Sequence, residues 1–169
     1  MRNHPAWGTK NIVAWDVSVQ GARNMNSLCT ANPNIYYFSY VTSNTLLDSS
    51  SNRHVPDKSM SYIIRANSRL MGMKKAYYAD GSETDSTWFE NDGIVNKKSM
   101  LGPTTGNNGS DPIGNYRQND ILIPGQWYVM GEYKSDHRKF VGHSLSIKEF
   151  DDLIKIYLKH LSLLWTLPK

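Results

Sequence analysis

Two residue types suited to acid–base chemistry fall in predicted loops of the C-terminal two-thirds of the chain. His137 and His143 follow a predicted strand, which is where α/β enzymes usually display their catalytic side chains. Asp92 lies in the sequence Asn91-Asp92-Gly93, which is also common in ordinary turns. A histidine and an aspartate that folding brings together can act as a general base and the acid that orients it. Of the remaining histidines, His4 and His160 are expected to be incidental, and His54 lies in a predicted polar loop.

Ser144 is the serine whose surroundings most resemble those of a nucleophile. The segment Gly142-His143-Ser144-Leu145-Ser146 begins like the Gly-x-Ser-x-Gly elbow, but Ser146 stands at the final glycine position. The strand that would precede the elbow is too short and too charged to be a central parallel strand. Ser146 and Glu149 instead match a capping box, so we expect this segment to lead into a helix. A small independent esterase with Ser144 as its nucleophile remains an alternative.

The elements around these residues predict a layered fold. We expect a strand at Ile12–Val17, a helix capped by Ser18, and two strands at Ile35–Val41 and Gln126–Tyr133. Tyr62–Met71 is ambiguous between a helix and an irregular segment. Three stretches rich in turn residues are predicted loops: Ser43–Arg53, Ala79–Thr87 and Gly102–Asn119. The last helix has an apolar face at Ile147, Phe150, Ile154, Tyr157, Leu158, Leu161 and Trp165.

This succession of strands and helices predicts an α/β fold with a mostly parallel sheet, built as a single domain over residues 1–169. The small number of strong strands indicates a sheet cut partway through. With 39% hydrophobic and 20% charged residues, the composition is that of a globular chain.

Composition also limits the kinds of site and partner that this chain can have. Cys29 is the single cysteine, which excludes an internal disulfide and a cysteine-cluster metal site. Met1–Trp7 does not resemble a signal peptide, and no stretch approaches transmembrane length. Localisation is not assigned by these features. The basic residues are scattered, so we expect no nucleic-acid partner, whereas the net charge of +4 is compatible with contact to a lipid interface.

Four segments, in order, resemble the staphylococcal and thermophilic-Bacillus lipases, a family of secreted triacylglycerol lipases. The matching segments are Ala14–Ala22, Asn32–Tyr37, Trp88–Asn96 followed by Gly102-Pro103, and Gly125–His137 followed by Phe140–Gly142. The resemblance implies part of an α/β-hydrolase fold in which Asp92 is the triad acid and His137 is the base. It also implies that the parent protein is secreted.

The resemblance further implies that this chain is an incomplete domain. The family places its nucleophile elbow, part of its oxyanion hole and its lid upstream of the matching segments. We therefore expect an acylglycerol or another ester to be hydrolysed only together with the missing N-terminal half. The alternative is a non-catalytic remnant of a hydrolase fold that binds lipid or carbohydrate.

The family's metal ligands are expected to be lost. The resemblance implies calcium-binding carboxylates two and seven residues after the catalytic histidine, where this chain has Lys139 and Ser144. It implies a zinc-binding aspartate at the position of Asn11, and asparagine is a poor zinc ligand. Calcium requires several oxygen ligands and an ammonium repels it. We therefore expect no bound metal and no other cofactor, and the charge of Lys139 could replace that of the cation.

Overall fold

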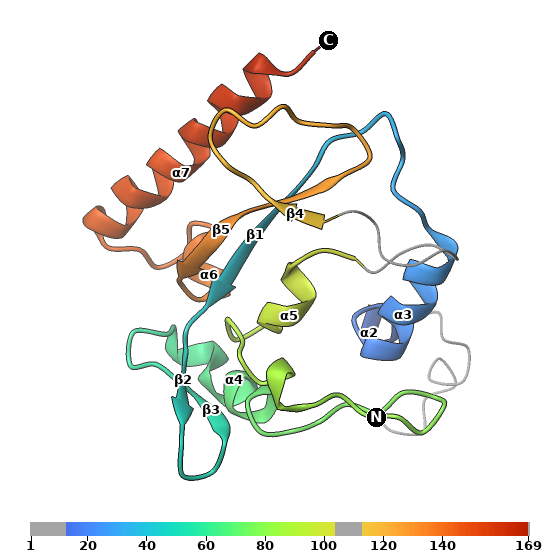
Figure 1. Cartoon of the computed structure of the whole chain (residues 1–169). Helices are drawn as coiled ribbons and strands as arrows, with labels where there is room; N and C mark the ends of the chain where they lie inside the picture. Colours follow the sequence, from blue (N-terminus) through green and yellow to red (C-terminus); the bar gives the residue numbers. More distant parts are fainter. Residues whose placement is uncertain (1–12, 104–112, 169) are drawn as a thin grey trace.

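A parallel sheet is the centre of the fold in the computed structural model, which describes residues 13–103 and 113–168. Strands β1 (Tyr37–Ser43), β5 (Trp127–Lys134) and β4 (Ile113–Asn115) lie in the order β1-β5-β4, with β5 parallel to both neighbours. The predicted strands 35–41 and 126–133 are therefore confirmed, each displaced by one or two residues. The α/β class is also confirmed, and Figure 1 shows β1 and β5 side by side at the centre of the molecule.

An antiparallel hairpin and a set of mostly short helices surround this sheet. The hairpin pairs β2 (Thr45–Asp48) with β3 (Arg53–Pro56). The helical segments are α2 (Val13–Asp16), α3 (Val19–Leu28), the 3-10 helix η1 (Tyr62–Ile64), α4 (Arg65–Met71), the 3-10 helix η2 (Ser86–Trp88), α5 (Lys97–Met100), α6 (His137–Phe140) and α7 (Ile147–Thr166). None of the helices in the part of the chain that the structure describes combines the length and apolarity needed to cross a membrane.

Two helix caps follow from local sequence. The Ser146 side chain accepts a hydrogen bond from the Glu149 N–H, and the Glu149 side chain accepts one from the Ser146 N–H, so the predicted capping box begins α7. The Ser18 hydroxyl accepts a bond from the Gly21 N–H at the start of α3, as predicted. Both caps satisfy N–H groups that the first helical turn leaves without intrahelical partners.

Other predictions about the elements were wrong or incomplete. Val13–Asp16 is a helical turn rather than part of a strand, and its N–H and C=O groups bond locally, as in the bond from Val17 N–H to Val13 O. The predicted loop 43–53 contains most of the β2–β3 hairpin, because its turn residues occupy only the tip, where Asn52 has a φ of 51°. The ambiguous segment 62–71 is a 3-10 helix followed by α4.

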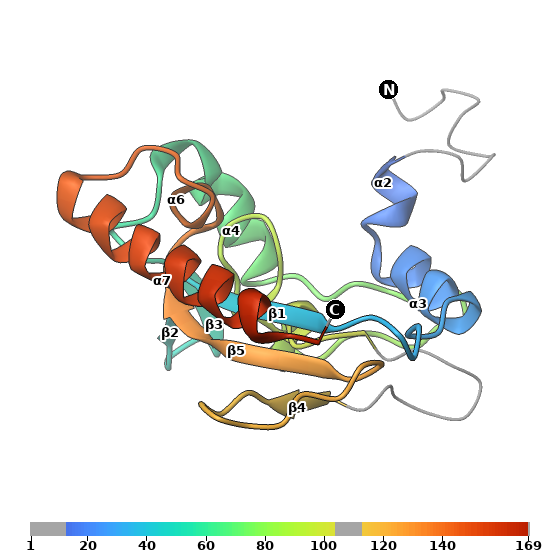
Figure 2. The same cartoon turned by 90° about the horizontal axis from the view of Figure 1, so that it is seen from above.

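The last helix presents two apolar faces rather than one. α7 runs along β1 and β5 (Figures 1 and 2), with Leu153 buried and the His160 ring edge-on to Phe38 and Tyr40. The apolar face predicted from periodicity is instead exposed, from 40% for Ile154 to 85% for Ile147 and Trp165. His160 is therefore part of the packing between α7 and β1, although the sequence indicated an incidental residue.

Polar side chains are as common as apolar ones among the buried residues that the structure describes, and several of them lie near the carboxyl ends of β1 and β5. Among the described residues, seven polar or charged side chains are buried beside seven apolar ones. Buried polar groups cost free energy unless they are hydrogen-bonded, so a network of this kind is expected to hold its members in fixed positions. Asp92 and Asp136 belong to it, and each is completely buried.

Candidate functional site: a buried aspartate paired with a histidine

Asp92 sits in the turn that its sequence predicted, and that turn surrounds its carboxylate with donors. Oδ1 accepts hydrogen bonds from the N–H groups of Ile94 at 3.0 Å and Val95 at 2.8 Å. Oδ2 accepts one from the hydroxyl of Thr42, at the carboxyl end of β1, at 2.8 Å. An ionised carboxylate only accepts hydrogen bonds, so this set of donors matches the ionised form of Asp92.

His137 is the first residue of α6 and reaches Asp92 through two contacts. Its Nδ1 lies 3.0 Å from Asp92 Oδ2, and its backbone N–H donates to the carbonyl oxygen of Asp92 at 3.0 Å. Because the carboxylate can only accept, Nδ1 carries the proton in this pair and Nε2 has the free lone pair. The His137 side chain is 39% exposed. The structure thus brings together the two predicted site residues, and Nε2 receives no hydrogen bond from the described residues.

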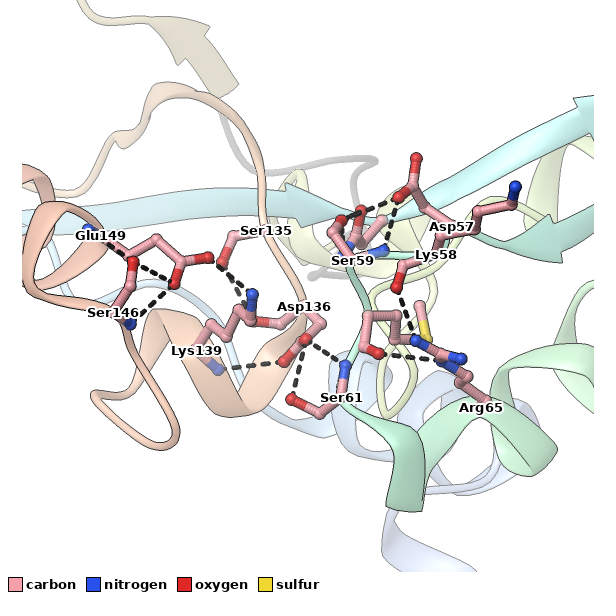
Figure 3. Close-up of polar contacts among 12 residues, drawn as sticks. Asp57, Lys58, Ser59, Ser61, Arg65, Ser135, Asp136, Lys139, Ser146 and Glu149 are labelled. Carbon is pink, nitrogen blue, oxygen red and sulfur yellow. Dashed lines mark hydrogen bonds and ion pairs between the residues drawn. The ribbon is translucent and has the colours of Figure 1, made fainter.

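Asp136 has a different position, although it is adjacent to His137. Its Oδ1 accepts the N–H of Lys139 at 3.0 Å and so caps α6. Its Oδ2 accepts the N–H and the hydroxyl of Ser61 at 2.7 and 3.0 Å (Figure 3). Asp136 therefore fixes the helical turn on which His137 stands, which gives a physical reason why Asp92 rather than Asp136 faces the imidazole.

The turn that carries Asp92 is fastened by its neighbours. The amide of Asn91 donates to the carbonyl oxygens of Ser68 at 3.2 Å and Phe89 at 2.8 Å, and its side-chain oxygen accepts the Gly93 N–H at 2.9 Å. Gly93 has a φ of 97°, a conformation that favours glycine. A Cβ at this position would lie 2.6 Å from Ile64 Cδ1, so close packing also requires glycine here.

Sequence reasoning missed the residues that support the pair. Thr42, Asn91 and Ser61 were not singled out, although each donates a hydrogen bond to Asp92, to its turn or to Asp136. Thr42 carried a usable signal, because it is a polar residue at the carboxyl end of a buried parallel strand. Ser61 lies 75 residues from Asp136 and carried no comparable signal.

The remaining sequence candidates lie outside this pair. Ser144 is exposed, has a φ of 58° and follows helix α6 rather than a strand; within the described part of the chain, no hydrogen bond joins it to His137. His143 is exposed in the same connection. His54 lies on β3 with Nδ1 3.1 Å from Thr45 Oγ1, and burial lowers its pKa. His4 lies outside the described residues.

The calcium site implied by the resemblance does not fit the residues present. The Lys139 ammonium lies 2.6 Å from Glu149 Oε1, so a cationic group already neutralises the nearest carboxylate, and Ser144 adds no charge. Over residues 13–103 and 113–168, no group of three or more His, Cys, Asp or Glu side chains could hold a metal ion. Asn11, the predicted lost zinc ligand, lies outside the described residues. The absence of a bound metal or cofactor stays a prediction.

A family model described as "Lipase-like, C-terminal domain" matches residues 1–162. Among curated proteins, the lipase of Staphylococcus hyicus is 28% identical over 138 residues, and lipase 1 of Staphylococcus aureus is 27% identical over 141 residues. These matches take in 81–83% of this chain but only 18–19% of the relatives. The chain thus spans about a fifth of the length of the curated relatives it matches.

Solved structures give the same picture. EstA from Clostridium botulinum superimposes with a TM-score of 0.77 and 31% identity over 92% of this chain and 36% of EstA. The crystal structure of Staphylococcus hyicus lipase gives a TM-score of 0.72 and 25% identity, over 95% of this chain and 40% of that structure. The resemblance inferred from four short segments is therefore confirmed, as is the partial α/β fold.

Proposed function

The chain belongs to the family of lipase-like C-terminal domains, and from that premise we propose that it supplies the acid and the base of a serine ester hydrolase. Asp92 is the acid and His137 is the base. The nucleophilic serine comes from a segment outside these 169 residues, which contain no Gly-x-Ser-x-Gly sequence. The substrates are carboxylic esters, with acylglycerols as the preferred class. The observation that carries the proposal is the 3.0 Å contact between His137 Nδ1 and the buried Asp92 carboxylate.

Each group has a defined task in the proposed reaction. A serine hydroxyl is a weak nucleophile until a base accepts its proton, and the free Nε2 of His137 is suited to accept it. The serine oxygen then bonds to the ester carbonyl carbon, and Nε2 returns the proton to the departing alcohol. Water repeats the sequence on the acyl-serine, releasing the acid and restoring the hydroxyl. Asp92 holds the imidazole in the required tautomer and stabilises the imidazolium formed in each half-reaction.

The surroundings of Asp92 favour this division of roles. The carboxylate receives donors from Thr42, Ile94 and Val95 in addition to His137, and it is completely buried. A carboxylate held in this way is fixed in position before any substrate arrives, so little reorganisation is needed as the imidazole becomes charged. The His137 side chain is 39% exposed, and in this proposal the incoming serine approaches its Nε2.

The first test asks whether this chain works beside a reactive serine. A fluorophosphonate probe, which labels activated serines, is added to native extract from the source, and the chain is captured with an antibody against it. We expect labelled serine in a species heavier than 19.2 kDa or in a second chain that remains bound to it. Capture of an unlabelled 19.2 kDa species alone would contradict the proposal and favour a lipid- or carbohydrate-binding remnant.

The second test asks whether Asp92 and His137 are the acid and the base. Each is substituted in the protein or complex that the fluorophosphonate labels. Asp92→Asn and His137→Ala are each expected to lower kcat for ester hydrolysis by about 10⁴-fold or more, by analogy with other serine hydrolases. Asp152→Asn on α7 and His143→Ala serve as controls, since both residues are exposed and lie outside the pair. Hydrolysis that survives both site substitutions would refute the assignment.

A further inference from the structure

Lys139 lies two residues after His137 on the same short helix, and its ammonium points toward a different element. Nζ lies 2.6 Å from Glu149 Oε1, on the first turn of α7 (Figure 3). The Lys139 side chain is 18% exposed, which is less than any other lysine or arginine in the ion pairs of the described residues. The Lys139 end of the pair is therefore shielded from solvent, whereas the Glu149 side chain is 41% exposed, so salt screens the pair in part.

Both ends of this ion pair are fixed by further hydrogen bonds. Glu149 Oε2 accepts the N–H of Ser146 at 2.8 Å and its hydroxyl at 2.7 Å, so the carboxylate is held in one orientation. The hydrogen bond from Lys139, as the main cause, and those from Ser146, as the next, lower the pKa of Glu149 to about 2. On the other side, the Lys139 N–H donates to Asp136, whose second oxygen is bound by Ser61.

These contacts form a continuous polar network, and the turn that carries His137 lies in its middle. The network runs from Ser61, before η1, through Asp136, which caps α6, and Lys139 on α6 to Glu149 and Ser146 at the start of α7 (Figure 3). α6 contains only four residues, and its backbone hydrogen bonds, such as the one from Phe140 N–H to Asp136 O at 3.0 Å, close its own turn without fixing how that turn lies against neighbouring elements. Its orientation therefore depends on external contacts, which are those of this polar network and the two bonds from His137 to Asp92.

We propose that Lys139 is a positioning residue: its ammonium is an internal cation that holds the His137 turn against α7, where the resemblance implied a divalent metal. The inference rests on the proposed role of His137, but it concerns the placement of the imidazole rather than ester hydrolysis. An ammonium provides one charge and three donors at a fixed point, whereas calcium would need several oxygen ligands that these residues do not assemble. The orientation of His137 is then independent of calcium.

The test follows the proton on His137 Nδ1 by NMR in the complete chain, because a proton held between imidazole and carboxylate gives a downfield resonance that exchanges slowly with water. Lys139→Met is expected to speed this exchange at least tenfold or to abolish the resonance, and Lys139→Arg is expected to restore it. Lys155→Met is the matched control, since Lys155 pairs with Asp152 on the exposed side of α7 at 3.0 Å. An unchanged resonance in Lys139→Met would overturn the proposal.

A second variant and a metal titration keep the test decisive. If Lys139→Met fails to fold, Glu149→Gln removes the same ion pair from its other end and must produce the same change in exchange. Thermal unfolding of the unsubstituted chain is expected to have the same midpoint in calcium and in EDTA. A midpoint raised by calcium would overturn the claim of an internal cation. Neither readout requires ester hydrolysis, so a failure here is distinguishable from a failure of the proposed function.

Discussion

Replacing Thr42 by valine tests the buried network directly, because the change removes one hydroxyl and keeps the shape of the side chain. Thr42 is 3% exposed, and its hydroxyl donates to Asp92 Oδ2 at 2.8 Å. A hydrogen bond to a charged group contributes about 1.5–3 kcal/mol to stability. Asp92 keeps three other donors, and therefore only one hydrogen bond is lost. We expect Thr42→Val to lower the free energy of unfolding by about 2 kcal/mol. For a chain of this length that corresponds to a fall of about 4–8 °C in the unfolding midpoint.

Urea denaturation followed by tryptophan fluorescence measures this change, with two comparison variants. Thr42→Ser keeps the hydroxyl and should retain most of the stability. Thr166→Val removes an exposed hydroxyl that bonds to Leu163 O at 2.7 Å, and it should change stability by less than about 0.5 kcal/mol. A loss below about 0.5 kcal/mol for Thr42→Val would refute the view that this donor supports the carboxylate.

Two other substitutions test the turn and the helix packing. Gly93→Ala should cost about 2 kcal/mol, because φ is 97° and the new Cβ would lie 2.6 Å from Ile64 Cδ1; urea unfolding with no measurable loss would contradict this. Burial lowers the pKa of His160, and within the described residues its buried Nδ1 lacks a hydrogen-bond partner. The folded chain therefore favours the neutral ring. Its contribution to the free energy of unfolding is present above about pH 6.5 and is lost as the pH falls below that value. His160→Phe should flatten the loss of unfolding free energy between about pH 7 and pH 5, and an unchanged slope would oppose that reasoning.

The features that sequence could predict are those coded locally. The capping box of Ser146 and Glu149 lies within four residues, and it marks the start of α7 correctly. The strands β1 and β5 are rich in aromatic and β-branched residues, a composition that favours strands. Residue type alone left an ordinary turn as the alternative for Asp92 and a structural role as the alternative for His137. The prediction that they are the acid and the base depended on the resemblance to a known family.

The features that sequence could not predict depend on partners far along the chain. Thr42 meets Asp92 across 50 residues, and Ser61 meets Asp136 across 75, so neither contact leaves a local pattern. The faces of α7 were misjudged for the same reason. Periodicity identifies an apolar stripe, but the side that meets β1 is chosen by the neighbouring rings of Phe38 and Tyr40.

The double link between His137 and Asp92 has a consequence for assembly. The two residues are 45 positions apart, and closing a loop of that length costs about 3 kcal/mol of chain entropy beyond a constant. Folding of this region has already met that cost, since one link is a backbone hydrogen bond and the other joins the side chains. In the proposed hydrolase, a third reacting group arriving from another segment would therefore join a pair that already exists. Its arrival is a meeting of two bodies rather than three, and its rate depends on how it docks rather than on any search by the two loops.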